Sequence, residues 1–143
     1  MKKSAKVLSP SKEDYLETIL MLSSDGEPVR LVDIARAHDV SKATVSDTLS
    51  RLGDGGYVVY EKYRPVTLTQ KGKRVAALTL DKHNLLIKFL TKALGVEYSK
   101  AEVAACKMEH AIGADIACRL SEFIGRLESK GMLGDSDGGP NDV

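Results

Sequence analysis

The first part of the chain alternates between apolar and polar positions with the spacing of amphipathic helices. From residue 12 to residue 23 the apolar positions recur on one face of a helix that Ser9 caps and Pro10 starts. The same spacing predicts shorter helices over residues 29–38 and 42–52, with a tight turn between them and Ser41 as the cap of the second. The expected core positions in these three helices are Tyr15, Leu16, Ile19, Leu20 and Leu22, then Leu31, Ile34 and Ala35, then Val45, Leu49 and Leu52.

The pattern changes at the glycine-rich run 53–56, which ends the third helix. Residues 57–60 and 65–69 are rich in β-branched and aromatic side chains and flank a charged turn at 61–64, which predicts a β-hairpin. Thr69 then has the position of a cap for a long helix from residue 70 to about 94, which Gly95 closes.

Ser99 to Glu102 has the form of a capping box, which predicts another helix to about residue 127, continuous or broken near Gly113. Residues 131–143 are rich in Gly, Asp and Pro and have little to bury, so we expect a disordered tail there. The order of elements predicts a mainly α fold, in which a winged helix-turn-helix domain (1–73) is followed by a helical domain (74–130).

Composition narrows the possible classes of protein. The 143 residues suffice for one compact domain and a helical appendage, and no apolar run approaches the ~20 residues of a membrane span. The basic N-terminus lacks the apolar stretch of a secretory signal, so we expect a cytoplasmic protein. Cys106 and Cys118 show no CxxC spacing, which argues against a disulfide; each is expected to be a buried thiol or a metal ligand.

The charge is distributed unevenly, but only slightly. The net charge is +1; residues 1–80 hold 13 basic and 10 acidic side chains, and the remainder hold 8 and 10. This asymmetry is as typical of an ordinary surface as of nucleic-acid binding. The sequence motifs are needed to distinguish an ordinary surface from a nucleic-acid-binding one.

A helix, a tight turn, a capped helix and a hairpin, in that order, form a winged helix-turn-helix, whose second helix enters the major groove of DNA. If Val45, Leu49 and Leu52 face the core, the opposite face is available to bases and phosphates. Lysine and arginine at the tip of the wing suit phosphate. The predicted DNA contacts are Ser41, Lys42, Ala43, Thr44, Ser46 and Asp47 on the helix and Lys62 and Arg64 on the wing. A winged helix that binds protein instead remains open.

Residues with metal-ligand side chains form two helical clusters. Asp14 and Glu17 are three apart on the first helix, and a thiol, carboxylates and an imidazole follow one another on the late helix at spacings of four, three and one. A histidine of the long helix can add a nitrogen. The candidates outside the first helix are His83, Glu102, Cys106, Glu109 and His110. Surface acids, a core cysteine and an exposed histidine are the open alternatives.

Several motifs resemble, in register from about Pro10 to Leu127, the diphtheria toxin repressor and manganese transport regulator family. They are Ser11-Lys12-Glu13-Asp14-Tyr15-Leu16-Glu17, Asp33-Ile34-Ala35, Thr44-Val45-Ser46, Tyr60-Glu61-Lys62-Tyr63-Arg64, Leu68-Thr69-Gln70-Lys71-Gly72, His83 and Glu109-His110.

The resemblance implies a homodimeric repressor of metal-uptake genes that binds double-stranded, palindromic operator DNA with Fe²⁺ or Mn²⁺ as corepressor. It places metal ligands at Asp14, Glu17, His83, Cys106, Glu109 and His110. The two acids of the first helix resemble the manganese branch of the family, whereas Cys106 resembles the iron branch and favours Fe²⁺ slightly. Glu102 and Ile87 depart from the pattern of a second metal site.

Two competing functions remain at this point. A metal-independent winged-helix regulator would need no cluster of ligands, and its DNA binding would survive a chelator. A small metalloenzyme would need an open coordination position and a general base, and the sequence contains no HExxH motif to support one.

Overall fold

The computed structural model describes residues 8–23 and 26–133. The chain divides into two compact units between Thr79 and Leu80. The predicted mainly α fold is confirmed, whereas the domain bounds 73 and 74 stay a prediction. The elements are α1 (Pro10–Leu22), α2 (Leu31–His38), α3 (Lys42–Asp54), β1 (Val58–Val59), β2 (Thr67–Leu68), α4 (Gln70–Lys88), the π-helix η1 (Phe89–Ala93), α5 (Tyr98–Met108) and α6 (Ala114–Ser129). The basic N-terminus and nearly all of the expected tail lie outside the described residues.

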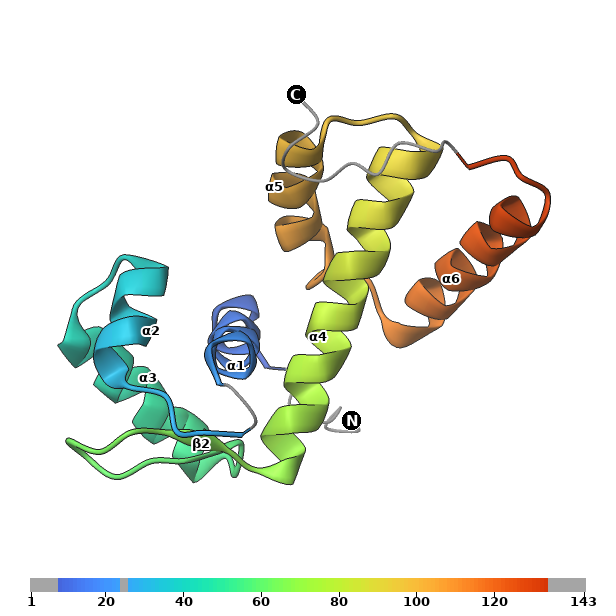
Figure 1. The fold of residues 1–143 in the computed structure, drawn as a ribbon. Helices are drawn as coiled ribbons and strands as arrows, with labels where there is room; N and C mark the ends of the chain where they lie inside the picture. Colours follow the sequence, from blue (N-terminus) through green and yellow to red (C-terminus); the bar gives the residue numbers. More distant parts are fainter. Residues whose placement is uncertain (1–7, 24–25, 134–143) are drawn as a thin grey trace, which may run out of the picture. The chain divides into compact units, whose positions relative to one another are not determined.

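In unit 1, the helices α1, α2 and α3 surround one apolar core, and the β1–β2 hairpin extends along the end of α3 (Figure 1). The inward positions of α3, Val45, Leu49 and Leu52, are at most 1% exposed, as their spacing predicts. Leu22 is 43% exposed, so its prediction as a core residue was wrong. It is the last residue of α1, and the chain leaves the helix in an extended conformation at Ser23.

The entrance to α2 differs from the expectation. Val29 and Val66 form an antiparallel bridge through two backbone hydrogen bonds of 2.8 and 2.9 Å, so the helix begins at Leu31 instead of residue 29. This bridge joins positions far apart in sequence, which a local pattern does not predict. It fastens the return strand of the hairpin to the start of α2.

The predicted hairpin is confirmed, with Val58 paired to Leu68 and Val59 to Thr67. Thr69 caps α4 as expected, since its hydroxyl accepts from the Gly72 N–H at 3.0 Å and donates to the Gly56 carbonyl at 2.7 Å. A Cβ on Gly72 would lie 1.9 Å from the carbonyl oxygen of Tyr57. The first turn of α4 therefore packs directly on the backbone at the start of the hairpin, and only glycine fits there.

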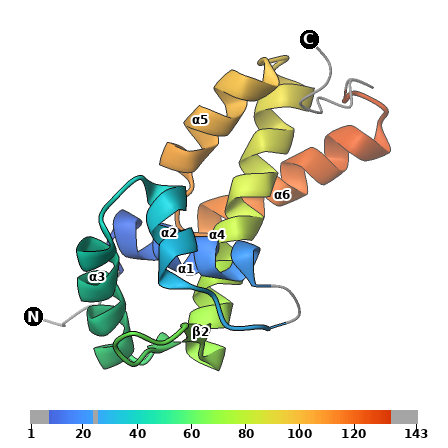
Figure 2. The same ribbon diagram turned by 60° about the vertical axis from the view of Figure 1, so that its left-hand side comes forward.

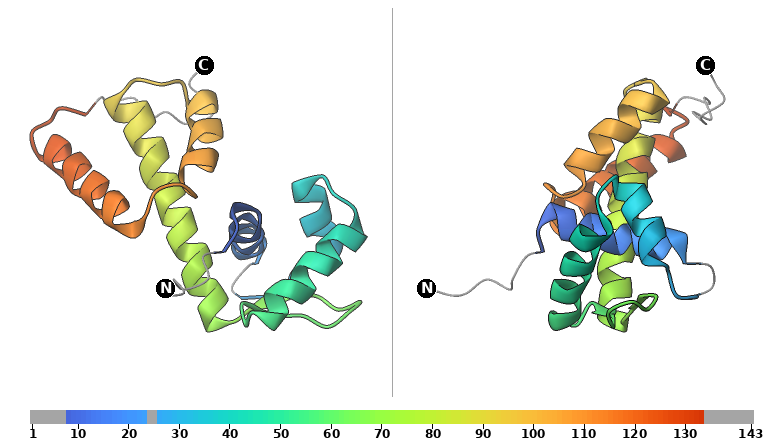
Figure 3. Two further views of the ribbon diagram at one scale, coloured as in Figure 1. Left: turned by 180° about the vertical axis from the view of Figure 1, so that it is seen from behind. Right: turned by 90° about the vertical axis from the view of Figure 1, so that its left-hand side faces the viewer.

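In unit 2, α5 and α6 lie on either side of the C-terminal part of α4, as Figure 2 and the left view of Figure 3 show. Leu86, Leu90, Ala101 and Ala105 form the buried core. The long helix extends as predicted, but its last turn widens into η1 before Gly95, whose φ of 69° ends it. The sequence pattern gave no sign of the π-helical turn.

The predicted capping box is wrong. The helix α5 begins at Tyr98 with Glu97 as its N-cap, and the Ser99 hydroxyl donates to the Glu97 carboxylate at 2.9 Å. The helix ends at Met108 and α6 begins after Gly113, so the alternative with a break is confirmed and the continuous helix is excluded. Among the described residues, no helix is both long and apolar enough to span a membrane.

Candidate functional site

The outward face of α3 carries the side chains predicted to contact DNA. Lys42, Ala43 and Thr44 are exposed in its first turn. The Ser41 hydroxyl caps the helix by accepting from the Thr44 N–H at 3.1 Å, and it lies 2.9 Å from the Thr44 hydroxyl. These bonds fix the start of the helix, and they leave the basic and methyl groups of the first turn facing solvent.

Further along α3, two of the predicted contacts have partners within unit 1. Ser46 is partly buried, and its hydroxyl lies 2.8 Å from the hydroxyl of Tyr60 at the end of β1. Asp47 forms an exposed ion pair of 3.4 Å with Arg51, one turn later on the same helix. This pairing offsets the repulsion that a carboxylate would exert on phosphate.

The tip of the hairpin is basic and aromatic. Lys62 and Arg64 are exposed, and Arg64 forms a 3.5 Å ion pair with Glu61. Tyr63 lies between them, 89% exposed, with the Lys62 ammonium 5.3 Å from its ring centroid. Tyr63 is not among the DNA contacts predicted from the sequence, although it lies between two of them.

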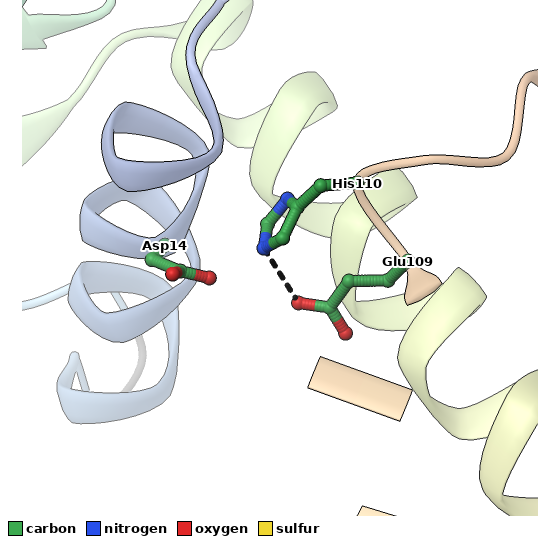
Figure 4. A group of neighbouring side chains, drawn as sticks. All are labelled: Asp14, Glu109 and His110. Atoms are coloured by element: carbon green, nitrogen blue, oxygen red, sulfur yellow. Dashed lines mark ion pairs between the residues drawn. The ribbon is translucent and has the colours of Figure 1, made fainter. Parts of the chain in front are cut away.

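In unit 2, the structure brings together three of the predicted metal ligands. One oxygen of the Glu109 carboxylate lies 2.6 Å from Nδ1 of His83 on α4, and the other lies 3.3 Å from Nε2 of His110. Figure 4 shows the contact between Glu109 and His110 as a dashed line. The side chains are 1%, 13% and 7% exposed for Glu109, His83 and His110. A buried carboxylate with an imidazole against each oxygen is a donor set that suits a divalent transition metal.

A lysine holds the loop that follows these ligands. The Lys82 ammonium donates to the carbonyl of Ile112 at 3.0 Å, which ties α4 to the turn between α5 and α6. Ile112 packs against the core of unit 2. The turn that carries His110 is therefore held to α4 at Ile112.

The other candidates of unit 2 lie on α5. Cys106 and Glu102 are exposed, and so is Cys118 on α6, so of the two alternatives for the cysteines, a buried thiol or a metal ligand, the buried thiol is excluded. The sequence spacing predicted that Cys106 and His110 lie on one face of a single helix. Because α5 ends at Met108, His110 lies beyond the helix, and this prediction was wrong for His110. Glu109 still follows the helix, since its N–H donates to the Ala105 carbonyl at 2.9 Å.

In unit 1, Asp14 and Glu17 lie on α1, where Asp14 is partly buried and Glu17 is buried. On the same helix Tyr15 stacks on the ring of His38, with centroids 4.3 Å apart, and the Thr18 hydroxyl lies 2.9 Å from Nε2 of that ring. Burial lowers the pKa of His38 below its ordinary 6.5, and the nearby Asp14 carboxylate partly opposes this shift.

The first unit has a capped helix with an exposed polar face and a basic wing, and the second has a His–Glu–His cluster. Together they define the class of metal-dependent, DNA-binding regulators of transcription.

Two family matches cover most of the chain. Residues 7–66 match the N-terminal DNA-binding domain of the iron dependent repressors, and residues 69–133 match the metal binding and dimerisation domain of the same family. The descriptions of the two domains support DNA and a second copy of the chain as partners.

Relatives of known class agree with these matches. An uncharacterised HTH-type transcriptional regulator of Methanocaldococcus jannaschii is 36% identical over 124 residues, which cover 86% of this chain and 99% of that protein. The HTH-type transcriptional regulator MntR of Lysinibacillus sphaericus is 32% identical over 84% of this chain and 86% of its own length.

Solved structures have the same fold. The manganese regulator SloR superposes with a TM-score of 0.71 at 30% identity, and a manganese-dependent transcriptional repressor in complex with manganese superposes with 0.71 at 29% identity. These matches cover 82% and 80% of this chain, which spans only 55% and 52% of those two proteins.

The chain belongs to the iron dependent repressor family, and it is a metal-dependent, DNA-binding regulator of transcription. The metal-independent regulator considered above is not supported. The relatives are regulators of transcription and not enzymes, so the metalloenzyme alternative is set aside as well.

Proposed function

We propose that this chain represses transcription as a cytoplasmic homodimer that binds a palindromic operator when Fe²⁺ or Mn²⁺ is bound. The observation that carries the proposal is the buried Glu109 carboxylate, with an imidazole against each of its oxygens. Burying an ionised carboxylate is costly unless a cation or strong hydrogen bonds compensate it. A divalent ion held by these side chains supplies that compensation.

The donor set extends beyond these three residues. We propose Asp14 and Glu17 as carboxylate ligands from unit 1 and Cys106 as a thiolate ligand from α5, together with His83, Glu109 and His110. These carboxylate, imidazole and thiolate side chains would hold the ion, which would supply a positive charge to offset theirs. If the ligands come from both units, as this set would require, occupancy of the site would restrict how the DNA-binding unit is oriented. We propose Glu102, which is exposed on α5, only as a peripheral metal ligand.

Of the two ions we propose Fe²⁺ as the preferred corepressor. Carboxylates favour Mn²⁺, but one thiolate is a larger departure from oxygen-and-nitrogen coordination than one carboxylate more or less. Mn²⁺ is also the weakest binder in the usual divalent series. The solved structures named for manganese make Mn²⁺ the alternative.

On the DNA side, we propose that α3 lies in the major groove, with Thr44 and Ala43 contacting bases and Lys42, Lys62 and Arg64 contacting phosphates. Ser41, Ser46 and Asp47 complete the same surface. In a dimer, two such helices bind half-sites about 34 Å apart, one turn of the duplex. Metal and DNA then strengthen each other's binding by the same factor.

The metal part is tested by replacing His110 with alanine. Fluorescence anisotropy of a labelled operator, titrated anaerobically with Fe²⁺ or Mn²⁺, should show metal-dependent binding for the parent and none for His110→Ala. Circular dichroism and sedimentation should show that the variant remains folded and dimeric. The exposed neighbour Lys107→Ala serves as the matched control and should respond as the parent does. Retention of metal-responsive binding by His110→Ala would contradict the assignment.

The DNA part is tested at Thr44. Thr44→Ala should reduce the free-energy difference between operator and random-DNA binding by about 1 kcal/mol, the lower end of the range for bidentate base contacts, because a hydroxyl makes a single contact. Lys62→Gln should weaken binding to both duplexes equally. An unchanged difference for Thr44→Ala would place the base-reading face elsewhere.

A further inference from the structure

The helix α1 lies between α2 and the first part of α4 in unit 1 (Figure 1). Leu16 and Ile19 on its inner face are fully buried in the apolar core of the unit. Apolar burial is non-directional, so it holds a helix against its neighbours more firmly than it fixes the rotation of that helix about its axis. The rotation of α1 matters because this helix carries the proposed ligands Asp14 and Glu17.

A hydrogen bond joins α1 to α4. The Thr79 hydroxyl can donate its proton to the Glu13 carboxylate at 3.2 Å or to the Val75 carbonyl of its own helix at 3.0 Å. Glu13 is the residue directly before Asp14. Thr79 is 1% exposed, and the Val75 carbonyl alone would satisfy its single hydroxyl proton. The contact with Glu13 therefore does more than satisfy a buried polar group, since it joins two helices across 66 positions of sequence.

A second polar contact joins α1 to α2. The ring of His38, the last residue of α2, stacks on Tyr15 with centroids 4.3 Å apart. Its Nε2 lies 2.9 Å from the Thr18 hydroxyl. Thr18 is the residue directly after Glu17. These two polar contacts thus reach α1 just before the first proposed ligand and just after the second.

The position of α1 has to be accurate for a metal site. Ligands have to be held within about 0.5 Å and about 20° of the productive geometry, whereas one residue step of a helix is about 100° and about 1.5 Å. A rotation of α1 by a quarter of a step would therefore already misplace both carboxylates. Hydrogen bonds depend on direction as well as distance, so the two contacts restrict the rotation that apolar packing leaves open.

We propose that Thr79 and His38 are positioning residues for the metal site. They do not bind the ion. Through Glu13 and Thr18 they fix the rotation of α1, and this rotation sets the direction in which the helix presents its carboxylates. The inference rests on the proposed function, which places metal ligands on α1, and it adds two residues outside the proposed ligand set.

The first test compares Thr79→Val, which removes the hydroxyl, with Thr79→Ser, which removes the methyl group. The full-length protein is titrated with Mn²⁺ alone, without DNA, and the free ion is measured by electron paramagnetic resonance. In Thr79→Val the dissociation constant of Mn²⁺ should rise about tenfold, the lower end of the usual effect for partners that orient metal ligands. In Thr79→Ser it should equal that of the parent.

Thermal unfolding in the presence of a chelator separates positioning from stability. Thr79→Ser leaves a cavity where the buried methyl group was, whereas Thr79→Val fills the site, so the serine variant should have the lower midpoint. The order of the two variants should therefore be opposite for stability and for Mn²⁺ affinity.

The matched control is Thr91→Val in unit 2. Thr91 is 8% exposed, and its hydroxyl donates to the Ile87 carbonyl one turn earlier at 2.8 Å. The substitution removes a buried hydroxyl that joins no second helix, so Mn²⁺ affinity should not change.

At the contact with α2, His38→Phe keeps a ring for Tyr15 but has no nitrogen for the Thr18 hydroxyl. At about pH 7.5 the substitution removes no charge, because burial holds the pKa of His38 below its ordinary 6.5. Mn²⁺ affinity should fall about tenfold here as well, and His38→Gln, whose amide replaces Nε2, should restore it.

Parental Mn²⁺ affinity in both Thr79→Val and His38→Phe would show that apolar packing alone positions α1, and it would overturn the inference while the proposed function stands. Affinities that follow the thermal midpoints would make both residues merely structural and would overturn the inference as well. If the parent itself binds neither Mn²⁺ nor Fe²⁺, the proposed function is overturned together with the inference.

Discussion

Cys106 lies on α5, three residues before Glu109, with its side chain exposed. Its thiolate is the softest donor of the proposed set, and softness separates the ions that share the remaining ligands. The carboxylates and imidazoles accept Mn²⁺ and Fe²⁺ alike. With the proposed ligand set, we therefore expect the choice between the two ions to depend on this one side chain.

Replacing Cys106 with glutamate should shift the response toward Mn²⁺, because a hard oxygen replaces the thiolate. The measurement is anaerobic operator binding titrated with each ion, expressed as the ratio of half-saturating Mn²⁺ to Fe²⁺. We expect this ratio to fall at least about tenfold, or about 1.4 kcal/mol. Cys118→Ala, which removes the other exposed thiol, should leave the ratio unchanged. The same ratio in Cys106→Glu and parent would show that Cys106 does not select the metal.

A second residue, His38, makes the stability of the fold depend on pH. Its ring stacks on Tyr15 and hydrogen-bonds with Thr18, which joins the end of α2 to α1. Because burial lowers its pKa, the folded state takes up a proton less readily than the unfolded chain does. The contribution of His38 to the stability of the folded state is complete at pH values above its ordinary pKa of 6.5. It decreases as the pH falls below that pKa.

We therefore expect the free energy of unfolding to fall between about pH 7.5 and about pH 5.5, and to fall less in His38→Gln. Urea unfolding of both proteins in the presence of a chelator measures the difference and keeps metal binding out of it. Equal losses in the two proteins would assign the pH dependence to other groups.

At the scale of elements, local signals predicted local structure. The caps Ser9, Ser41 and Thr69 were identified because a cap and its helix lie within three residues of each other. The same rule failed at Ser99, where the preceding Glu97 offers its carboxylate to the hydroxyl. The bridge between Val29 and Val66 depends on the packing of the whole unit, so no short pattern contains it.

The contact between Gly72 and the Tyr57 backbone leads to a prediction about packing. Gly72→Ala should destabilise unit 1 by about 3 kcal/mol or more, because a backbone carbonyl cannot move aside for the added methyl group. Gly125→Ala is the matched control in α6: a Cβ there meets nothing within 4 Å, and alanine is the better helix former. That variant should be neutral or up to about 1 kcal/mol more stable. The measurement is the thermal unfolding midpoint of each variant, and equal midpoints in the two variants would contradict the packing argument.

At the scale of the whole molecule, the sequence supplied the ligand types but not their pairing. His83 and Glu109 are 26 residues apart, and only the fold brings their side chains to 2.6 Å. Spacing placed Cys106, Glu109 and His110 on one long helix, whereas the chain turns away after Met108. The residues were predictable because their chemistry is visible in the sequence, and their arrangement was not because it follows from tertiary packing.

The exposed apolar side chains of the single chain also predict where its dimer interface lies. On α6, Ile116 and Phe123 are seven residues apart, hence on one helix face, and they are 52% and 41% exposed. Large apolar side chains left in solvent are typical of a protein–protein interface, and this segment matches a dimerisation domain.

Phe123→Glu should therefore raise the dimer dissociation constant at least about 30-fold, corresponding to the 2 kcal/mol of a central interface residue. Sedimentation equilibrium measures it, and Glu122→Ala, an exposed neighbour on α6, should behave as the parent does. Operator affinity should fall with dimerisation, because two linked recognition helices bind two half-sites at a high effective concentration and a monomer does not. A Phe123→Glu protein that remains dimeric and binds its operator normally would place the interface on another face of unit 2.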